Sequence, residues 1–201
     1  MRITDIDGKT YLDAVSGGVW TVNVGYGRKE IVDAVAKQMM EMCYFANGIG
    51  NVPTIKFSEK LISKMPGMSR VYLSNSGSEA NEKAFKIVRQ IGQLKHGGKK
   101  TGILYRARDY HGTTIGTLSA CGQFERKVQY GPFAPGFYEF PDCDVYRSKF
   151  GDCADLGVKM AKQLEEVILT VGPDELGAVI VEPMTAGGGI LVPPAGYYET
   201  I

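Results

Sequence analysis

The residues best suited to chemistry lie in the stretch SNSGSEANEKAFK, from Ser74 to Lys86. The preceding RVYLSN predicts a short strand, so the chain passes from a strand through Ser-Gly-Ser directly into a helix. The first N–H groups of a helix have no acceptor within it, and a glycine lets a ligand approach the backbone closely. Because the helix dipole also favours negative charge at this end, Ser76, Gly77 and Ser78 predict a phosphate-binding site.

An alternative interpretation gives this stretch a purely structural role. Ser78 could simply cap the helix, with Glu82 one position beyond the usual capping-box residue. Both interpretations fit the segment taken alone.

The common nucleotide-binding motifs do not account for this stretch. VGYGRKE and NGIGNVP each begin the dinucleotide fingerprint GxGxxG, but neither carries the third glycine. GQLKHGGKKT does not match a P-loop, because its lysine and threonine are out of register. A nucleotide-binding α/β domain is therefore the weakest of the interpretations considered.

Apolar periodicity along the rest of the chain predicts strands that alternate with helices. ITDIDGKTYLDAVSG predicts a β-hairpin around Asp7-Gly8, while TGILYRA and LGAVIVEP predict strands, the latter buried on both faces. Helices are expected over residues 28–42, after Pro53, after Ser78, and from Leu156 onward. Residues 112–151 predict an irregular connection. The apolar stripe expected on the third helix comprises Ala80, Ala84, Ile87, Val88 and Ile91.

This alternation predicts an α/β fold, a mostly parallel sheet with helices on both faces, preceded by an N-terminal β-hairpin. We expect residues 1–50 to form a hairpin-and-helix segment and residues 51–201 to form a ligand-binding domain. Ligands bind such sheets at the carboxyl ends of the strands. NSGSEAN, RDYHGTT and EPMTAGGG each follow a predicted strand, which places them at one site.

Composition excludes several classes of partner. The net charge of +1 gives no support for binding nucleic acid or an acidic membrane surface. No apolar run is long enough to span a membrane, and MRITDIDGKT is not a signal peptide. Four scattered cysteines without a CxxC pair, and only two histidines, predict no metal site and free thiols in the cytoplasm.

Several motifs, in this order, resemble one family. LDAVSGGVW, VGYG, NSGSEANE, YHG and VIVEP followed by GGG and GYY are similar to the class III, or ω-amino acid, aminotransferases, from about residue 4 to residue 201. The resemblance implies a pyridoxal-phosphate enzyme of fold type I that acts as a homodimer with a shared active site. SGGVWTVNVGYG, CYFAN and SKMPGMSRVY resemble most closely the branch that uses taurine and pyruvate. An ω-amino donor such as taurine or β-alanine, and pyruvate or a similar keto acid as acceptor, are therefore expected.

The resemblance also assigns roles to individual residues. Gly77 and Ser78 would hold the cofactor phosphate and Tyr110 would stack on the pyridine ring. The expected cofactor-binding set is Ser76, Gly77, Ser78, Tyr110, His111, Gly112 and Glu182, and the expected substrate pocket is Trp20, Tyr44 and Phe45. Structural alternatives exist for several of these residues: Trp20 as a core residue, Tyr110 as an edge aromatic, His111 as a packing residue and Glu182 as a surface charge.

Two expected features of the family are missing from these residues. The Schiff-base lysine should follow the VIVEP strand, yet the last lysine is Lys162, and the aspartate that pairs with the ring nitrogen is also absent. No catalytic residue is therefore assigned within this chain, and the sequence is interpreted as a fragment truncated before that lysine. The alternative, if the chain truly ends at Ile201, is a non-catalytic pyridoxal-phosphate-binding or structural protein.

Overall fold

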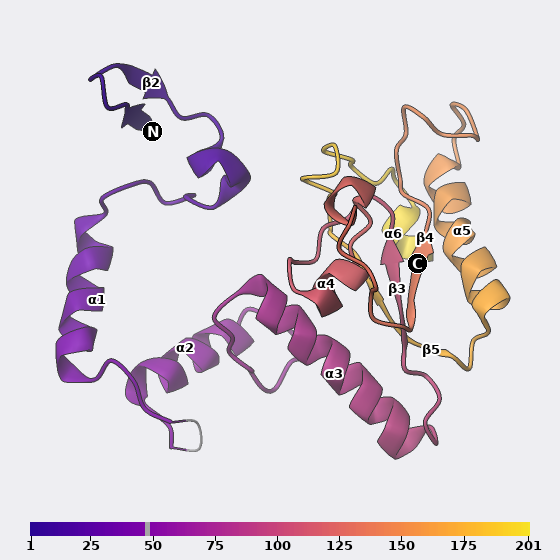
Figure 1. The fold of residues 1–201 in the computed structure, drawn as a ribbon, viewed down its shortest axis with the longest axis horizontal. Helices are drawn as coiled ribbons and strands as arrows, with labels where there is room; N and C mark the ends of the chain where they lie inside the picture. The colour runs from indigo at the N-terminus through magenta and orange to yellow at the C-terminus, as the bar shows by residue number, and fades with distance from the viewer. Residues whose placement is uncertain (47–48) are drawn as a thin grey trace. The chain divides into compact units, whose positions relative to one another are not determined.

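The computed structural model describes residues 1–46 and 49–201. By their internal contacts these residues form two compact units, Met1–Val71 and Tyr72–Ile201. Figure 1 shows the elements of both along the chain. The boundary at residue 50 stays a prediction about the domains of the protein. None of the described helices is both long enough and apolar enough to cross a membrane.

The unit Met1–Val71 contains a hairpin and two helices. Strands β1 (Arg2–Thr4) and β2 (Thr10–Leu12) pair antiparallel, which confirms the predicted hairpin. An irregular turn η1 (Ser16–Trp20) follows, and then the helices α1 (Lys29–Glu41) and α2 (Val52–Ile62). The side chain of Asn51 caps α2, and its proline lies in the first turn as expected.

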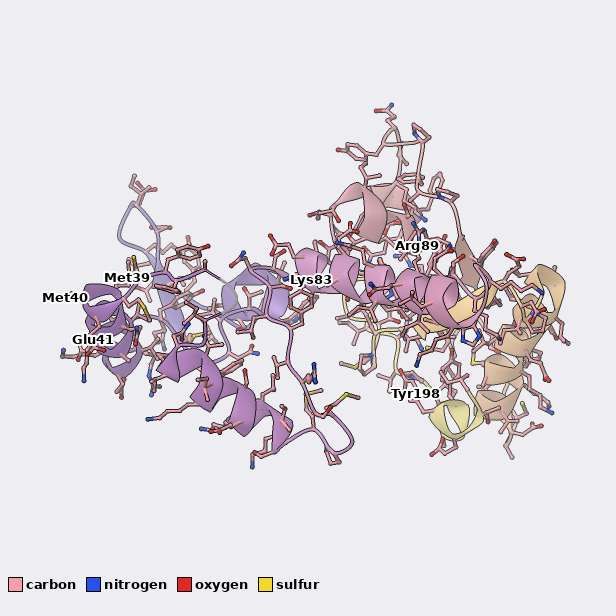
Figure 2. All side chains as sticks on the ribbon, turned by 90° about the horizontal axis from the view of Figure 1, so that it is seen from below. Met39, Met40, Glu41, Lys83, Arg89 and Tyr198 are labelled. Atoms are coloured by element: carbon pink, nitrogen blue, oxygen red, sulfur yellow. The ribbon has the colours of Figure 1, made fainter. Side chains whose placement is uncertain are left out.

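The side chains of this first unit are not buried by its own residues. Among residues 1–46 and 49–71 none is classed as buried, and the apolar residues of α1 are exposed. Met39 and Met40, labelled in Figure 2, are 62% and 90% exposed. The helical periodicity therefore correctly located these helices, but nothing among the described residues of this unit covers their apolar faces.

The unit Tyr72–Ile201 is built on a three-stranded parallel sheet of order β4-β3-β5. Its strands are β3 (Gly102–Arg106), β4 (Phe137–Phe140) and β5 (Leu176–Ile180). Its helices are α3 (Gly77–Lys95), the short α4 (Ile115–Ser119), the single turn η2 (Phe124–Arg126), α5 (Leu156–Val171) and α6 (Tyr197–Thr200). The α/β prediction with a parallel sheet is confirmed.

The core lies against the central strand β3, all five residues of which are buried. Ile103 and Tyr105 pack with Phe85 of α3, while Leu104 packs with Leu164 of α5. Alternate residues of β3 thus meet different helices, as expected for a strand covered on both faces. In the C-terminal half of α3, Arg89 (Figure 2) donates a hydrogen bond of 2.8 Å to the carbonyl of Pro135.

Three predictions of local structure are wrong for the described residues. RVYLSN is not a strand: a strand needs a hydrogen-bonded neighbour, and residues 70–75 have none in the described sheets. The supposedly irregular stretch 112–151 contains α4 and β4, because its short apolar FYEF run pairs with β3. The strand β5 is not buried on both faces: its residues alternate between partly buried and exposed, because the described residues leave the face with Val179 uncovered, at 44% exposure.

The predicted buried stripe of α3 is also largely wrong. Phe85 and Gly92 are buried and Val88 packs on the same core cluster. A Cβ on Gly92 would lie 2.8 Å from the Thr101 side chain, so only a glycine permits this close packing. The exposed members of the predicted stripe are Ala80, Ala84, Ile87 and Ile91. The helix carries a second apolar face, centred on Phe85, and this face rather than the predicted stripe packs against the sheet.

Candidate functional site

Ser76, not Ser78, caps the candidate phosphate-binding helix α3. The Ser76 hydroxyl accepts a hydrogen bond of 3.2 Å from the N–H of Glu79, and the Glu79 carboxylate accepts one of 2.9 Å from the N–H of Asn75. This arrangement is a variant of the capping box, in which the glutamate reaches one residue further back. The interpretation of Ser78 as the cap is therefore wrong, and its hydroxyl is available for another contact.

The first turn of α3 has the properties of an anion site. The N–H groups of Gly77 and Ser78 have no acceptor within the helix, since they belong to its first turn. A Cβ built on Gly77 would have no atom within 4 Å, so the space in front of this backbone is open. The 19-residue helix adds the positive end of its dipole. A phosphate group fits this position on steric and electrostatic grounds.

Two hydrogen bonds tie this first turn to the segment that follows β3. The Ser78 hydroxyl accepts 3.1 Å from the N–H of Thr113, and the Asn81 amide donates 2.7 Å to the carbonyl of His111. These contacts span 35 and 30 residues of sequence. The YHG motif is therefore held beside the helix N-terminus.

Gly112 is required for this close approach. Its φ of +140° disfavours any other residue, and a Cβ there would lie 2.5 Å from the Ser78 hydroxyl oxygen. One turn further along α3, Glu82 accepts a hydrogen bond of 2.5 Å from the hydroxyl of Thr114, the residue that caps α4. The two helix N-termini are thus fixed to each other.

Tyr110 is held by contacts of its backbone and of its ring. Its N–H donates 2.7 Å to the Glu182 carboxylate, whose other oxygen accepts 3.1 Å from the N–H of Ala186. The Arg126 guanidinium lies 4.8 Å from the centre of the Tyr110 ring, within range of a cation–π contact. Glu182 is partly buried, and its carboxylate accepts hydrogen bonds from the backbone of two different turns. It is therefore not simply an exposed charge on the surface.

His111 is buried, with 6% of its surface exposed, and its Nε2 has no hydrogen-bond partner in the described part of the chain. Burial lowers the pKa of His111 below its usual value, and the nearby Arg106 acts in the same direction, while Asp109 opposes both. The imidazole is therefore neutral near pH 7.

The structure brings together one of the two predicted sets of residues. Ser76, Gly77 and Ser78 form the start of α3, which meets the Tyr110–Gly112 turn through Ser78, and that turn meets Glu182, all within the unit Tyr72–Ile201. The predicted substrate-pocket residues Trp20, Tyr44 and Phe45 lie in the unit Met1–Val71 and are 48%, 79% and 49% exposed. Their common pocket stays a prediction. For Trp20, a core role is wrong within its own unit.

Sequence reasoning missed a buried network behind the Tyr110 turn. Arg106 and Asp109 are fully buried and paired, with Thr185 beside them. The available signal was the charged run RARD, which begins on a strand whose other residues are apolar. Among the described residues, no group of His, Cys, Asp and Glu is arranged to hold a metal ion.

A parallel sheet, with the N-terminus of a helix tied to the segment that follows its central strand, is typical of α/β domains that bind their ligands at the carboxyl ends of the strands. The family model of class-III aminotransferases matches residues 1–201, and the chain belongs to that family. The resemblance found in the sequence is thereby confirmed.

Curated relatives point to one branch of the family. The chain is 56% identical over 201 residues to a taurine–pyruvate aminotransferase of Rhodobacter capsulatus, covering all of this chain and 44% of the relative. It is equally similar, at 56%, to a hypotaurine/taurine–pyruvate aminotransferase of Paracoccus denitrificans, again covering 100% and 44%. The chain therefore spans less than half the length of these relatives.

Solved structures confirm the predicted fold class. A transaminase from an uncultivated Pseudomonas species, solved in a PLP-bound form, superposes with a TM-score of 0.92 at 33% identity, over 99% of this chain and 46% of that one. A transaminase from a study of ancestral reconstruction superposes with a TM-score of 0.94 at 38% identity, over 100% and 45%.

Proposed function

We propose that this chain is the cofactor-binding part of a pyridoxal-phosphate-dependent aminotransferase, which moves an amino group from an ω-amino donor to pyruvate or a similar keto acid. The observation that carries the proposal is the N-terminus of α3, where open space faces Gly77 and the first N–H groups lack helical acceptors. The names of the 56%-identical relatives support the choice of donor and acceptor.

The described residues fit the phosphate of pyridoxal phosphate. Gly77 and Ser78 would donate their N–H groups to it, each hydrogen bond to a charged oxygen contributing about 1.5–3 kcal/mol. Ser76 is the N-cap of α3, so the N–H groups of Gly77 and Ser78 point out of the N-terminal end of the helix. When bound, the cofactor supplies an electron sink for the carbon that bears the amino group.

The remaining residues of this set would orient the cofactor ring. Tyr110 would place its ring on a face of the pyridine, with its backbone fixed by the Glu182 carboxylate. His111 and Gly112 complete the turn, and the neutral imidazole of His111 adds no charge next to the ring. Glu182 acts here as a positioning residue.

Taurine and β-alanine are the donors that this proposal favours. Each is a short chain with an amine at one end and an anion at the other. Trp20, Tyr44 and Phe45 would form an aromatic wall that admits such a slim chain. The last lysine of this chain, Lys162, precedes β5, whereas the lysine that binds the cofactor is expected after that strand. We therefore place that lysine in a region that corresponds to the part of the relatives not spanned by this chain.

The proposal extends to a homodimer in the cytoplasm. The uncovered apolar face of α1 supports association with another surface, here a second copy. Free cysteines at positions 43, 121, 143 and 153 support a reducing compartment.

An amine panel tests the proposed activity. The full-length protein, loaded with pyridoxal phosphate, is incubated with pyruvate and each amine, and the alanine produced is measured. We expect activity with taurine and β-alanine. Activity with simple α-amino acids and none with either ω-amino donor would overturn the substrate. If no amine gives alanine from pyruvate, or the corresponding amino acid from any other keto acid tested, the aminotransferase itself is overturned.

A further inference from the structure

A buried ion pair lies directly behind the turn that carries Tyr110. The side chains of Arg106, the last residue of β3, and Asp109 are both 0% exposed, and Nη2 of Arg106 lies 3.2 Å from the carboxylate. The cost of removing two charges from water often exceeds their attraction, so such a pair is a poor source of stability. Its contacts indicate a different role.

The pair holds both backbone polar groups of Glu182. The N–H of Glu182 donates 2.7 Å to Oδ2 of Asp109, and its carbonyl accepts 2.5 Å from Nη2 of Arg106. The hydroxyl of Thr185 donates to Oδ1 of Asp109 and accepts 3.2 Å from the same Arg106 nitrogen. The start of the turn after β5 is therefore fixed to the end of β3.

The side chain of Glu182 carries this constraint back to Tyr110. One carboxylate oxygen accepts from the N–H of Tyr110 and the other from the N–H of Ala186. A second tie joins the same two turns, because Nε of Arg108 donates 3.1 Å to the carbonyl of Gly188. A Cβ on Gly188 would collide with the Arg108 backbone, so the turns can approach this closely only at a glycine.

We propose that Asp109 is a positioning residue of this site: together with Arg106 it fixes the backbone of Glu182, and the Glu182 carboxylate then sets the place of the Tyr110 backbone and ring. This inference deepens the proposed function and rests on it where it assigns the Tyr110 ring to the cofactor. Asp109 acts through Glu182, since among the described residues the hydrogen-bond partners of its carboxylate are Arg106, Glu182 and Thr185.

The test is Asp109→Asn in the full-length protein, followed by hydrogen–deuterium exchange without cofactor. The amide nitrogen of asparagine cannot accept a hydrogen bond, so one of the bonds to Glu182 or to Thr185 and Arg106 is lost. We expect exchange in peptides 108–114 and 182–188 to accelerate about tenfold, while peptides from α5 keep the wild-type rate. Asp174→Asn, which removes the charge from an exposed 3.0 Å pair with Lys99, should change neither region.

A second variant keeps the test decisive if Asp109→Asn does not fold. Thr185→Val has nearly the same shape and leaves the ion pair intact, and it should accelerate exchange in the same two peptides about threefold. With cofactor added, both variants should reduce the circular dichroism that the bound ring acquires from its surroundings, and Asp174→Asn should not.

The outcomes separate the two proposals. Unchanged exchange in peptides 108–114 and 182–188, or an equal increase throughout the chain, would overturn the positioning role. If the unsubstituted protein shows no cofactor signal, the proposed function fails, while the exchange measured without cofactor still decides whether Asp109 fixes the two turns.

Discussion

Substituting Gly77 by alanine should separate cofactor binding from folding. A Cβ at this position meets no atom within 4 Å, and the residue does not have the positive φ that would strain a side chain. Alanine should therefore leave the stability of the cofactor-free protein unchanged, or raise it by about 0.4–1 kcal/mol through the unfolded chain. If a phosphate oxygen binds the Gly77 N–H, as proposed, the new methyl group should hinder its approach to the backbone.

The expected loss of affinity follows from one hydrogen bond. Separating the Gly77 N–H from a charged oxygen removes about 1.5–3 kcal/mol. At about 1.4 kcal/mol per factor of ten, pyridoxal phosphate should bind roughly 10- to 100-fold more weakly. The larger Gly77→Val should weaken it further.

The assay is a titration of the cofactor-free protein with pyridoxal phosphate, followed by absorbance, beside thermal unfolding without cofactor. Gly112→Ala is the matched control: its φ of +140° and its contact with the Ser78 hydroxyl should lower the unfolding temperature in the absence of cofactor. Wild-type affinity in Gly77→Ala would refute the phosphate site. If Gly77→Ala loses as much stability as Gly112→Ala, the inference that open space faces Gly77 is refuted.

Substitutions at three further residues address the ring contact, the buried histidine and the substrate pocket. Tyr110→Phe should keep most cofactor affinity while Tyr110→Ala weakens it about 2- to 10-fold, because the ring contact contributes about 0.5–1.5 kcal/mol; equal losses in a cofactor titration would shift the role to the hydroxyl. Burial lowers the pKa of His111, so the unfolded chain binds a proton that the folded chain does not, and the free energy of unfolding should fall as pH drops below about 6.5. His111→Gln should reduce that slope by up to about 1.4 kcal/mol per pH unit in denaturant titrations from pH 5 to 8, and an identical slope would contradict the burial argument. Trp20→Ala should raise KM for taurine and for β-alanine without changing cofactor affinity. A changed cofactor affinity with unchanged KM values would remove Trp20 from the substrate pocket.

The sequence was most informative where chemistry and local structure share the same residues. Ser-Gly-Ser before a helix predicted a helix N-terminus with free N–H groups, and α3 begins at Gly77. The capping residue was misassigned although the signal was present. Ser76 and Glu79 have the spacing of a capping box, whereas Ser78 and Glu82 do not.

Features that depend on distant partners could not be predicted. Asp109 contacts Glu182 and Thr185, which lie 73 and 76 residues further along the chain, and no local pattern encodes these contacts. The failed strand at RVYLSN has the same origin, because β-propensity does not supply a neighbouring strand. The exposed residue Ile87 shows that periodicity identifies an apolar helix face but not what covers it.

A crystal structure of the full-length protein with pyridoxal phosphate tests the central claim most directly. The account predicts that phosphate oxygens lie about 2.7–3.2 Å from the backbone nitrogens of Gly77 and Ser78, with the Tyr110 ring against the pyridine. A phosphate bound elsewhere, with the N-terminus of α3 facing only water, would contradict it.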